Sequence, residues 1–230
     1  MSKSIKKIIG YPKEESLHPL SQDRIVEAAL QLLLQMSLKE LSMRKIANKL
    51  EVKAAALYYH VKNKEELLQL LADKISIQMG EEWLDKSLSW QNQLIAWSNA
   101  FRNALKTYPS AVEIFTASIA ASYHRLLQIE WLYGVLAEAG FADRQIPWVS
   151  SILKNHVVGF VAEEFRIKKL TNETEGQEDD AITTFFETLP KNQFPHLVRL
   201  AMDITKPDWD EEFHFGVGVL LDGLTAQLHR

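Results

Sequence analysis

The chain has 230 residues, of which 47% are hydrophobic and 24% charged, and carries a net charge of −4. It is long enough for one large domain or two small ones, and its composition is that of an ordinary globular protein. The absence of cysteine excludes disulfides, thiol chemistry and cysteine-based zinc sites. Because the sequence has neither a run of about 18 apolar residues nor a signal-peptide pattern, we expect a cytoplasmic protein without a membrane span.

Charge is distributed unevenly along the chain. Residues 1–64 contain twelve Lys and Arg against six acidic residues, a net charge of +6, whereas the remaining 166 residues carry −10. A basic segment attached to an acidic body indicates that the first part meets a polyanion and the second does not. Charge alone is also compatible with a merely solvated lysine-rich surface.

The N-terminal part of the chain is predicted to contain a flexible basic arm, residues 1–20, followed by four helices. Ser21 and Ser42 are candidate N-caps, because hydrophobic residues follow each at the spacings of three and four that mark one face of a helix. The first predicted helix follows Ser21 and ends at residue 33. The other three span residues 43–50, 54–59 and 64–79.

The rest of the chain also follows the helical period. Pro109 and Gly140 are expected to end two helices, and the polar, acidic residues 169–181 are expected to form a loop. The predicted helices here span residues 90–108, 111–121, 123–139, 146–168, 195–204 and 208–228. Because no alternating strand pattern appears, we predict an all-α fold with a three-helix domain over residues 21–66 and a larger helical domain over residues 67–230.

The stretch KAAALYYHVKNK, residues 53–64, places three alanines before two tyrosines, a histidine and two of its three lysines. It follows the predicted helix 43–50 after a very short turn. Two short helices joined by so tight a turn within a basic segment are typical of a helix-turn-helix, whose second helix lies in the major groove of DNA. An ordinary buried helix is the alternative interpretation of the same residues.

The stretch LSMRKIANKLEVKAAALYYHVKNKEELL, residues 41–68, strongly resembles the TetR family of bacterial transcription regulators. The residues that carry the resemblance are Leu41, Ser42, Arg44, Ile46, Ala47, Val52, Leu57, Tyr58, His60, Lys64, Leu67 and Leu68. One departure is Glu51, because the family usually has glycine at this position of the turn. A left-handed backbone there costs a residue other than glycine about 1 kcal/mol.

The resemblance implies that the two short helices contact DNA. Ser42 would cap its helix and donate to a phosphate, and Arg44 would bind a base edge, with guanine favoured, through two hydrogen bonds. The start of the recognition helix would consist of Lys53, Ala54, Ala55 and Ala56. Small side chains allow the backbone to approach the groove and can contact thymine methyl groups, so Arg44 is expected to supply much of the specificity.

The end of the same stretch would hold the DNA backbone. The resemblance implies phosphate contacts from Tyr58, His60 and Lys64. For Tyr58 core packing is the alternative, and His60 lies close enough to the helix to cap it instead. Tyr59 is expected to pack in the core rather than to contact DNA.

The body of the chain resembles the C-terminal domain of tetracycline repressors at residues 89–105, 136–141 and 215–224, which implies a small-molecule site. The predicted ligand-binding residues are Trp97, Phe101, Phe115, Ser118, Leu132, His156 and Glu163. Each aromatic residue taken alone is more typical of a core. Glu163 or His156 is the candidate polar anchor for the ligand, although His156 also fits a core histidine.

Tetracycline repressors bind a magnesium–drug chelate, and this chain lacks most of the matching side chains. Phe101 and Glu163 are retained, but other matching positions are occupied by Gly80, Trp97, Phe115 and Leu132. Phenylalanine cannot ligate magnesium, and one carboxylate makes a poor site. We therefore expect no metal and no cofactor, and an aromatic or amphipathic organic effector.

Small residues in the last helices indicate close helix–helix packing, because glycine destabilises a helix and needs a compensating reason. The resemblance implies that residues 146–168 and 208–228 of two copies of the chain pack as a four-helix bundle. The predicted dimer interface contains Gly159, Gly216, Gly218, Gly223 and Ala226. A twofold dimer would place two recognition helices about 34–36 Å apart on a palindromic operator.

The leading hypothesis is therefore a ligand-responsive dimeric repressor. A DNA-binding regulator controlled by a protein partner, or an activator, is the alternative. An all-α enzyme is disfavoured, because the sequence has no HExxH motif, no phosphate-binding glycine loop and no Ser/His/Asp grouping, so no catalytic residue is expected.

Overall fold

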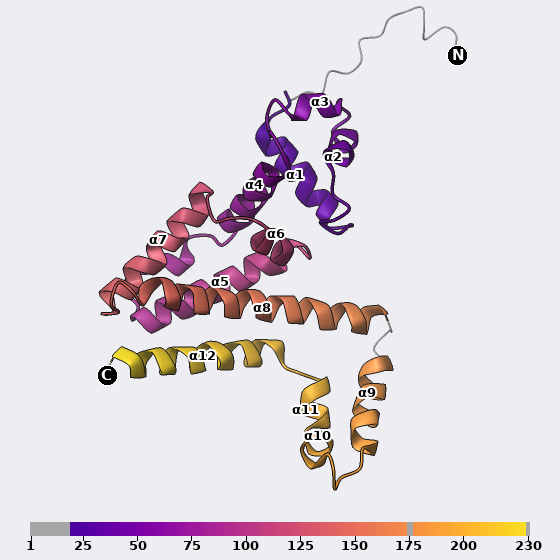
Figure 1. The fold of residues 1–230 in the computed structure, drawn as a ribbon, viewed down its shortest axis with the longest axis vertical. Helices are drawn as coiled ribbons and strands as arrows, with labels where there is room; N and C mark the ends of the chain where they lie inside the picture. Colours follow the sequence, from indigo (N-terminus) through magenta and orange to yellow (C-terminus); the bar gives the residue numbers. More distant parts are fainter. Residues whose placement is uncertain (1–18, 174–176, 229–230) are drawn as a thin grey trace, which may run out of the picture. The chain divides into compact units, whose positions relative to one another are not determined.

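The computed structural model describes residues 19–173 and 177–228, which are helical and contain no strand (Figure 1). The all-α prediction is therefore confirmed, whereas nearly all of the predicted arm lies outside the described residues. The chain divides into two compact units, with the boundary between Leu67 and Leu68. No helix of the described residues is long and apolar enough to cross a membrane.

The first unit is built on three helices: α1 (Gln22–Leu33), α2 (Met43–Lys49) and α3 (Ala54–Leu57). Ser21 is the N-cap of α1, since its hydroxyl accepts a hydrogen bond of 3.3 Å from the backbone N–H of Arg24. The core of the unit contains the fully buried side chains of Ile25, Ala29, Ile46, Leu57 and Val61. These apolar contacts hold the two short helices, which are too short to be stable alone.

Helix α4 (Lys64–Ile77) begins in the first unit and continues into the second. Its start is fixed by two hydrogen bonds that involve Glu66. Asn63 Oδ1 accepts from the N–H of Glu66 at 2.8 Å, and Glu66 Oε2 accepts from the N–H of Lys62 at 2.6 Å. The first bond satisfies an N–H group that the helix itself leaves unpaired, and the second ties the preceding residue to the first turn.

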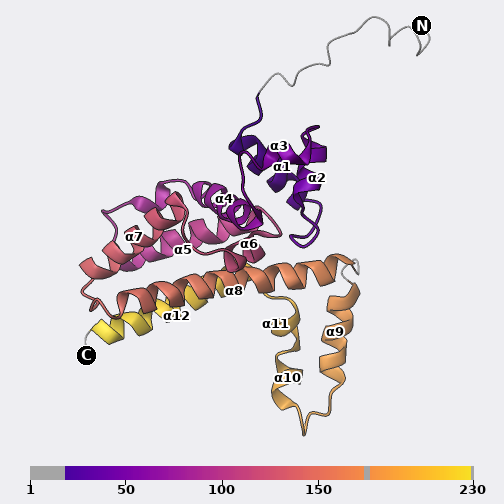
Figure 2. The ribbon, with the colours of Figure 1, turned by 45° about the horizontal axis from the view of Figure 1, so that its top comes forward.

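The second unit contains the remaining helices. They are a short 3-10 helix η2 (Glu82–Leu84), α5 (Trp90–Lys106), α6 (Ala111–Ala117), α7 (Tyr123–Glu138), α8 (Ile146–Glu173), α9 (Gln177–Thr188), α10 (Pro195–Arg199), α11 (Ala201–Thr205) and α12 (Trp209–Leu228). Helices α5, α7 and α12 each pack against α8. Figure 2 shows α8 and α12 running side by side. Each of the four helices α5, α7, α8 and α12 contributes a fully buried side chain to the core: Leu105, Leu136, Val157 and Phe213 respectively.

Several predicted boundaries differ from the structure. The helix that begins at Ile146 continues to Glu173, and α9 begins at Gln177, so a loop over residues 169–181 was wrong for most of that range. The prediction gave too much weight to polarity, since Glu, Gln and Lys are good helix formers. Residues 174–176 lie outside the described residues. Helix α3 ends at Leu57 rather than at residue 59, and α6 ends at Ala117 rather than at residue 121.

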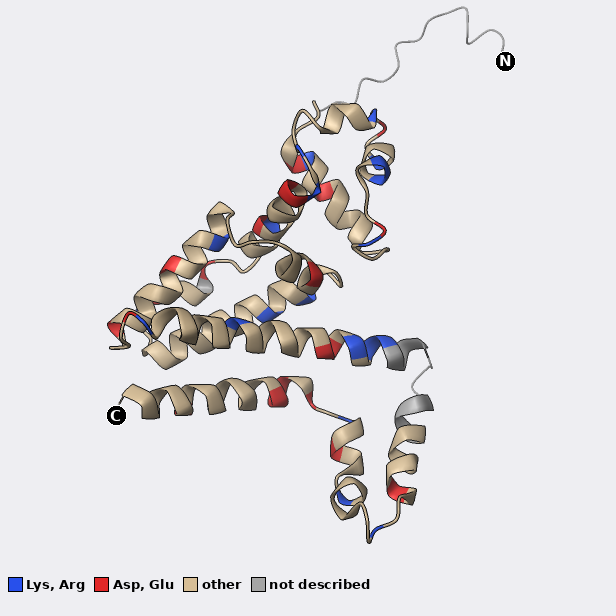
Figure 3. Cartoon of the chain, viewed as in Figure 1, with Lys and Arg blue, Asp and Glu red and all other residues tan. Residues whose placement is uncertain are grey.

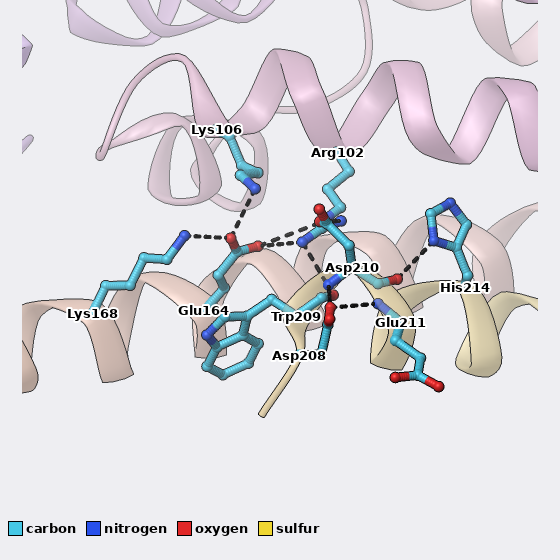
Figure 4. A network of polar contacts seen from close by, with 9 residues as sticks. All are labelled: Arg102, Lys106, Glu164, Lys168, Asp208, Trp209, Asp210, Glu211 and His214. Atoms are coloured by element: carbon cyan, nitrogen blue, oxygen red, sulfur yellow. Dashed lines mark hydrogen bonds and ion pairs between the residues drawn. The ribbon is translucent and has the colours of Figure 1, made fainter. Parts of the chain in front are cut away.

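A buried ion-pair network joins α5, α8 and α12 (Figure 4). Arg102 and Glu164 are only 4% and 2% exposed, and Arg102 NH2 lies 3.0 Å from Glu164 Oε2. The same guanidinium donates to Asp210 Oδ1 at 2.6 Å and to the carbonyl of Trp209 at 3.2 Å. Its plane also lies over the ring of Phe213, 4.7 Å from the centroid. Every polar contact of the guanidinium therefore leads to another helix.

Glu164 is held in its charged form by three cations. Burial raises the pKa of its carboxyl, but hydrogen bonds from Lys106, Lys168 and Arg102 outweigh burial and leave a pKa of about 2. The Nζ atoms of Lys106 and Lys168 lie 2.8 and 2.7 Å from Glu164 Oε1. The network therefore stabilises the fold above the ordinary carboxyl pKa of 4.5 and loses this contribution as the pH falls towards 2.

Replacing Glu164 by Gln tests this network. Glu164→Gln is expected to lower the free energy of unfolding at pH 7 by about 3–5 kcal/mol, because it leaves Arg102 buried without its main charge partner. Urea unfolding at a series of pH values should show the wild type losing stability between pH 4.5 and 2 more steeply than the variant.

The neighbouring Glu163 offers a matched control, because its side chain is half exposed and pairs with Arg166 in the same helix. Glu163→Gln is expected to change the free energy of unfolding by less than about 1 kcal/mol. Equal effects of the two substitutions would contradict the structural role of the buried pair.

Candidate nucleic-acid interface and ligand cavity

Helices α2 and α3 are joined by a tight turn in the first unit. The N–H of Val52 donates to the carbonyl of Ala47 at 3.0 Å, which closes the end of α2. Leu57 of α3 and Ile46 of α2 are both fully buried, so α2 braces α3 through apolar contact. The arrangement is the helix-turn-helix that the sequence predicted, with the remaining side chains of both helices available on the outside.

Glu51 adopts a left-handed backbone conformation, with φ of 57°. Among the described residues other than glycine it alone has a positive φ. This conformation normally favours glycine, because a Cβ atom crowds the backbone there. The structure therefore confirms that this chain places a glutamate where the turn itself favours glycine.

The start of the candidate interface is exposed. Ser42 is the N-cap of α2, and its Oγ accepts from the N–H of Lys45 at 3.3 Å, which leaves the hydroxyl proton free to donate to a phosphate. Arg44, Lys53 and Ala55 are exposed, while Ala54 and Ala56 are half-buried. Figure 3 shows the basic positions of α2 on this unit.

The end of the interface differs in part from expectation. Tyr59 is 89% exposed, so its predicted place in the core is wrong, and Tyr58 is 50% exposed. Because α3 ends at Leu57, Tyr59 lies beyond the helix, where no core face continues. His60 is half-buried, and its carbonyl accepts from Gln22 Nε2 at 3.2 Å, which ties it to α1. Lys64 is exposed and its Nζ lies 3.4 Å from the carbonyl of Leu38.

A small cavity lies between α5, α6, α7 and α8 of the second unit and has a volume of about 60 Å³. Its lining contains Trp97, Phe101, Phe115, Ala120, Arg125, Gln128, Ile129, Leu132, Ser150 and Lys154. The rings of Trp97 and Phe101 lie 5.2 Å apart, as do those of Phe101 and Phe115. The cavity thus combines three aromatic rings with aliphatic and polar side chains.

The structure brings together four of the predicted ligand-binding residues and separates the others. Trp97, Phe101, Phe115 and Leu132 line the cavity, and Ser118 lies beside it, where its Oγ accepts from Arg125 at 2.8 Å.

Neither proposed polar anchor is among the residues that line the cavity. His156 stacks on Phe213, with ring centroids 5.8 Å apart, and burial lowers the pKa of its imidazole. Glu163 is exposed and pairs with Arg166, which holds the pKa of its carboxyl below the ordinary value. Both side chains point away from the cavity because the helical period places them on other faces of α8.

The polar residues of the cavity come instead from α7 and from another face of α8. Arg125 and Gln128 are buried on α7, while Ser150 and Lys154 belong to α8. A signal for two of them is present in the sequence. Arg125, Gln128 and Leu132 follow the spacing of one helix face, so two long polar side chains share the face of a predicted pocket residue.

Helix α7 also holds the later turns of α4. The Asp73 carboxylate accepts from the backbone N–H of His124 at 2.9 Å and contacts its Nδ1 at 2.8 Å. Burial raises the pKa of Asp73, but these contacts with His124 outweigh it and lower the pKa overall. One turn further on, Gln128 Nε2 donates to the carbonyl of Ser76 at 3.2 Å. Gln128 therefore touches both the cavity and α4.

Comparison with known proteins identifies both units. Residues 25–71 match the profile of "Bacterial regulatory proteins, tetR family", and residues 85–228 match that of the "Tetracyclin repressor-like, C-terminal domain". The chain belongs to the TetR family. It is a ligand-responsive, DNA-binding transcriptional regulator and not an enzyme.

Individual relatives agree with this assignment. The chain is 34% identical to an HTH-type transcriptional regulator of Saccharopolyspora erythraea over 63% of its own length and 61% of that protein. It is 29% identical to the class D tetracycline repressor protein of Escherichia coli over 91% of each chain. Among solved structures, the TetR family protein ActR of Streptomyces coelicolor in complex with actinorhodin has a TM-score of 0.79 at 27% identity, covering 93% of this chain and 100% of that one.

Family membership relates the first unit to DNA binding and the second unit to the binding of small molecules. TetR-family regulators bind DNA through the first and small molecules in the C-terminal domain, and they act as dimers. No group of three or more His, Cys, Asp or Glu side chains in the described part of this regulator is placed to hold a metal ion. The cavity is lined by Arg125 and Lys154 and by no carboxylate, so a magnesium–drug chelate would meet cations there instead of the anionic ligands that favour magnesium.

The strained turn of this TetR-family regulator yields a stability prediction. Glu51→Gly is expected to raise the free energy of unfolding by about 1 kcal/mol, because glycine adopts the left-handed conformation without steric cost. Thermal unfolding followed by circular dichroism measures the change. Glu51→Ala is the control, since it removes the same carboxylate but keeps a Cβ atom. A glycine variant no more stable than the alanine variant would show that the turn is not strained.

Proposed function

We propose that this regulator is a dimeric repressor that leaves a palindromic operator when a small aromatic effector enters the cavity of its second unit. Its place of action would be the cytoplasm, where bacterial DNA lies. The observation that carries the proposal is the exposed surface of residues 42–60, which combines an arginine, small alanine side chains and two exposed tyrosines on a braced helix-turn-helix.

The roles proposed for the residues of this surface on DNA follow from the chemistry of their side chains. Ala54, Ala55 and Ala56 have no hydrogen-bonding side-chain atoms, so they offer the bases only methyl groups and a close backbone. Arg44 presents a fork of donors that fits O6 and N7 of guanine. Ser42, Lys53, Tyr58, His60 and Lys64 are proposed to contact phosphates, and the exposed Tyr59 joins them as a further candidate.

Substitution of Arg44 tests the assignment of base readout. Arg44→Ala is expected to cost about 1–3 kcal/mol of specific binding free energy, the value of one bidentate base contact. The operator is first obtained by selecting genomic fragments bound by the wild-type protein, which should share an inverted repeat. Fluorescence anisotropy at fixed salt then compares affinity for that operator and for variants at each base pair.

Arg199→Ala provides the control, because it removes the same charge from an exposed position of α10 in the second unit. The control should bind like the wild type. Unchanged affinity and unchanged base preference of Arg44→Ala would exclude Arg44 from base readout. Fragments without an inverted repeat, bound only at low salt, would count against a palindromic operator.

Helix α4 is the proposed route from the cavity to DNA binding. It starts at Lys64, a proposed phosphate contact, and its later turns are bound to α7 through Asp73 and Ser76. Gln128, which makes the second of these contacts, lines the cavity. A ligand that displaces α7 would therefore act directly on α4. Since a ligand shifts an equilibrium only by its differential affinity, it must prefer the arrangement that binds DNA less well.

Dimerisation is proposed to use the outward faces of α8 and α12. Trp148 and Ile152 on α8 are 53% and 45% exposed, and Phe215 and Val219 on α12 are 72% and 54% exposed. In each pair the residues are four apart and so share one helix face. Exposed apolar rows of this kind are typical of protein interfaces.

The predicted small residues fit this surface with one exception. Gly159, Gly223 and Ala226 continue the same helix faces, and a Cβ atom at Gly159, Gly218 or Gly223 would meet nothing within the chain. Gly216 instead faces its own α8, because a Cβ there would lie 2.6 Å from Cε1 of His156. Its small size is explained by packing inside one subunit.

Phe215→Glu tests the dimer. It places a charge in the centre of the proposed interface and is expected to convert the protein to a monomer at micromolar concentration, because an unpaired buried charge is costly. Sedimentation velocity measures the mass. Leu34→Glu is the control, since Leu34 is 54% exposed at the end of α1 in the first unit. A wild type that is itself monomeric would overturn the proposal.

A further inference from the structure

The cavity of the second unit is lined by two cations and no anion. Arg125 and Lys154 are among its ten lining residues, which include neither Asp nor Glu. Arg125 is only 7% exposed. Burying a guanidinium without a carboxylate partner costs free energy, so its presence in an aromatic pocket needs a reason.

The hydrogen bonds of Arg125 leave one edge of its guanidinium unused. NH1 donates to Ser118 Oγ at 2.8 Å and to the carbonyl of Ile119 at 3.0 Å. The plane lies over the ring of Phe115, 4.8 Å from its centroid. The Nε and NH2 groups have no acceptor among the described residues. These two groups form the parallel fork that binds a carboxylate through two hydrogen bonds.

Asp73 does not neutralise this cation through an ion pair. Its charge favours protonated Arg125, but its carboxylate contacts His124 and forms no ion pair with Arg125 in the described structure. Burial accordingly lowers the pKa of Arg125, although an arginine remains charged at neutral pH. The positive charge beside the cavity is thus left for another partner.

A second buried donor lies in the same wall. Trp97 is 3% exposed and lines the cavity, and its buried Nε1–H has no hydrogen-bond acceptor among the described residues. Indole N–H groups only donate, as do the guanidinium of Arg125 and the ammonium of Lys154. Two buried side chains, Arg125 and Trp97, therefore offer donors that meet no acceptor among the described residues, and the exposed Lys154 adds a third cationic donor at the cavity.

We infer that the effector is an aromatic carboxylate, held by the Nε/NH2 fork of Arg125 with its ring system among Trp97, Phe101 and Phe115. This inference rests on the proposed function for its place in regulation, because it names the chemical class of the effector of that same cavity. Lys154 adds positive charge from α8, and the Nε1–H of Trp97 donates a hydrogen bond to an oxygen of the ligand. Arg125 thus takes the role of polar anchor that the sequence had suggested for Glu163 or His156.

The size of the cavity sets a condition on binding. Its volume of about 60 Å³ is well below the roughly 300–1,000 Å³ of sites for drug-sized ligands. Ligand entry must therefore enlarge the cavity. Residues 118–122, between α6 and α7, include cavity residue Ala120 and have no regular secondary structure, and Ser118 and Ile119 of this segment are the two partners of Arg125 NH1.

Matched anionic and neutral probes test the inference on the full-length protein. Isothermal titration calorimetry at pH 7.5 compares benzoate, 2-naphthoate and anthracene-2-carboxylate with the corresponding primary amides, which have nearly the same shape without the charge. At least one carboxylate is expected to bind tenfold or more tightly than its amide. Binding of no carboxylate, or equal binding of carboxylate and amide throughout, would overturn the inference.

Substitutions then test whether Arg125 causes the preference for carboxylate over amide. Arg125→Gln is expected to reduce the carboxylate-to-amide preference to less than threefold, and Arg125→Lys to recover only part of it, because lysine keeps the charge but lacks the fork. Arg144→Gln is the control, since Arg144 lies over Trp148 at 4.9 Å and does not line the cavity. A full preference retained in Arg125→Gln would contradict the assignment.

Thermal unfolding and sedimentation confirm that each variant is folded and has the wild-type mass, and the wild-type comparison of carboxylate with amide stands without any variant. Release of operator DNA is measured separately. A carboxylate that binds with the expected preference but leaves DNA binding unchanged would support the anion site and refute the proposed ligand-controlled release. Release of DNA by neutral aromatic compounds alone would support ligand-controlled release and refute the anion site.

Discussion

The buried pair of Arg102 and Glu164 is the constraint on which the second unit depends. It fixes the mutual orientation of α5, α8 and α12, because the guanidinium contacts α8 and α12 through hydrogen bonds and aromatic rings at once. Such a pair adds little net stability compared with apolar packing, but any arrangement that separates the charges leaves one of them buried alone, at a cost of about 3–5 kcal/mol. The pair therefore penalises other packings of the three helices more than it stabilises this one.

With that orientation fixed, α8 presents different faces to the core, to the cavity and to solvent. Val157 and Val161 are fully buried in the core, and Glu164 continues the same side towards Arg102. Ser150 and Lys154 are four residues apart and face the cavity, whereas Trp148 and Ile152 are exposed. A shift of α8 by one residue would therefore move the cavity, the core and the exposed row together, which is why the ion pair bears on function as well as on folding.

Local signals in the sequence predicted most of the fold, and long-range contacts account for the failures. Ser21 and Ser42 are caps recognisable from their neighbours, and the strained Glu51 was apparent from the family pattern of the turn. Polarity around residues 169–181 was a poor guide, because charged residues form solvated helices as readily as loops. Glu163 lies next to Glu164, yet only Glu164 meets Arg102, and no local pattern states which of two adjacent carboxylates faces a residue 62 positions away. Arg125 shares a helix face with the predicted pocket residue Leu132, but that spacing does not state which other helices close the cavity around it.

The small cavity and the polar links of α7 to α4 have a joint consequence for regulation under the proposed function. A cavity of about 60 Å³ is far smaller than the roughly 300–1,000 Å³ of ligand sites, so the arrangement described here has little affinity for an aromatic effector. The effector must bind an opened arrangement, and the free energy of opening reduces its apparent affinity by the fraction of molecules that are open. The contacts of Asp73 and Ser76 with α7 resist opening, since they hold the wall that carries Arg125. A charged anchor suits this situation, because a bidentate ion pair in an aromatic pocket forms only once the ligand is inside and so favours the opened arrangement over the closed one.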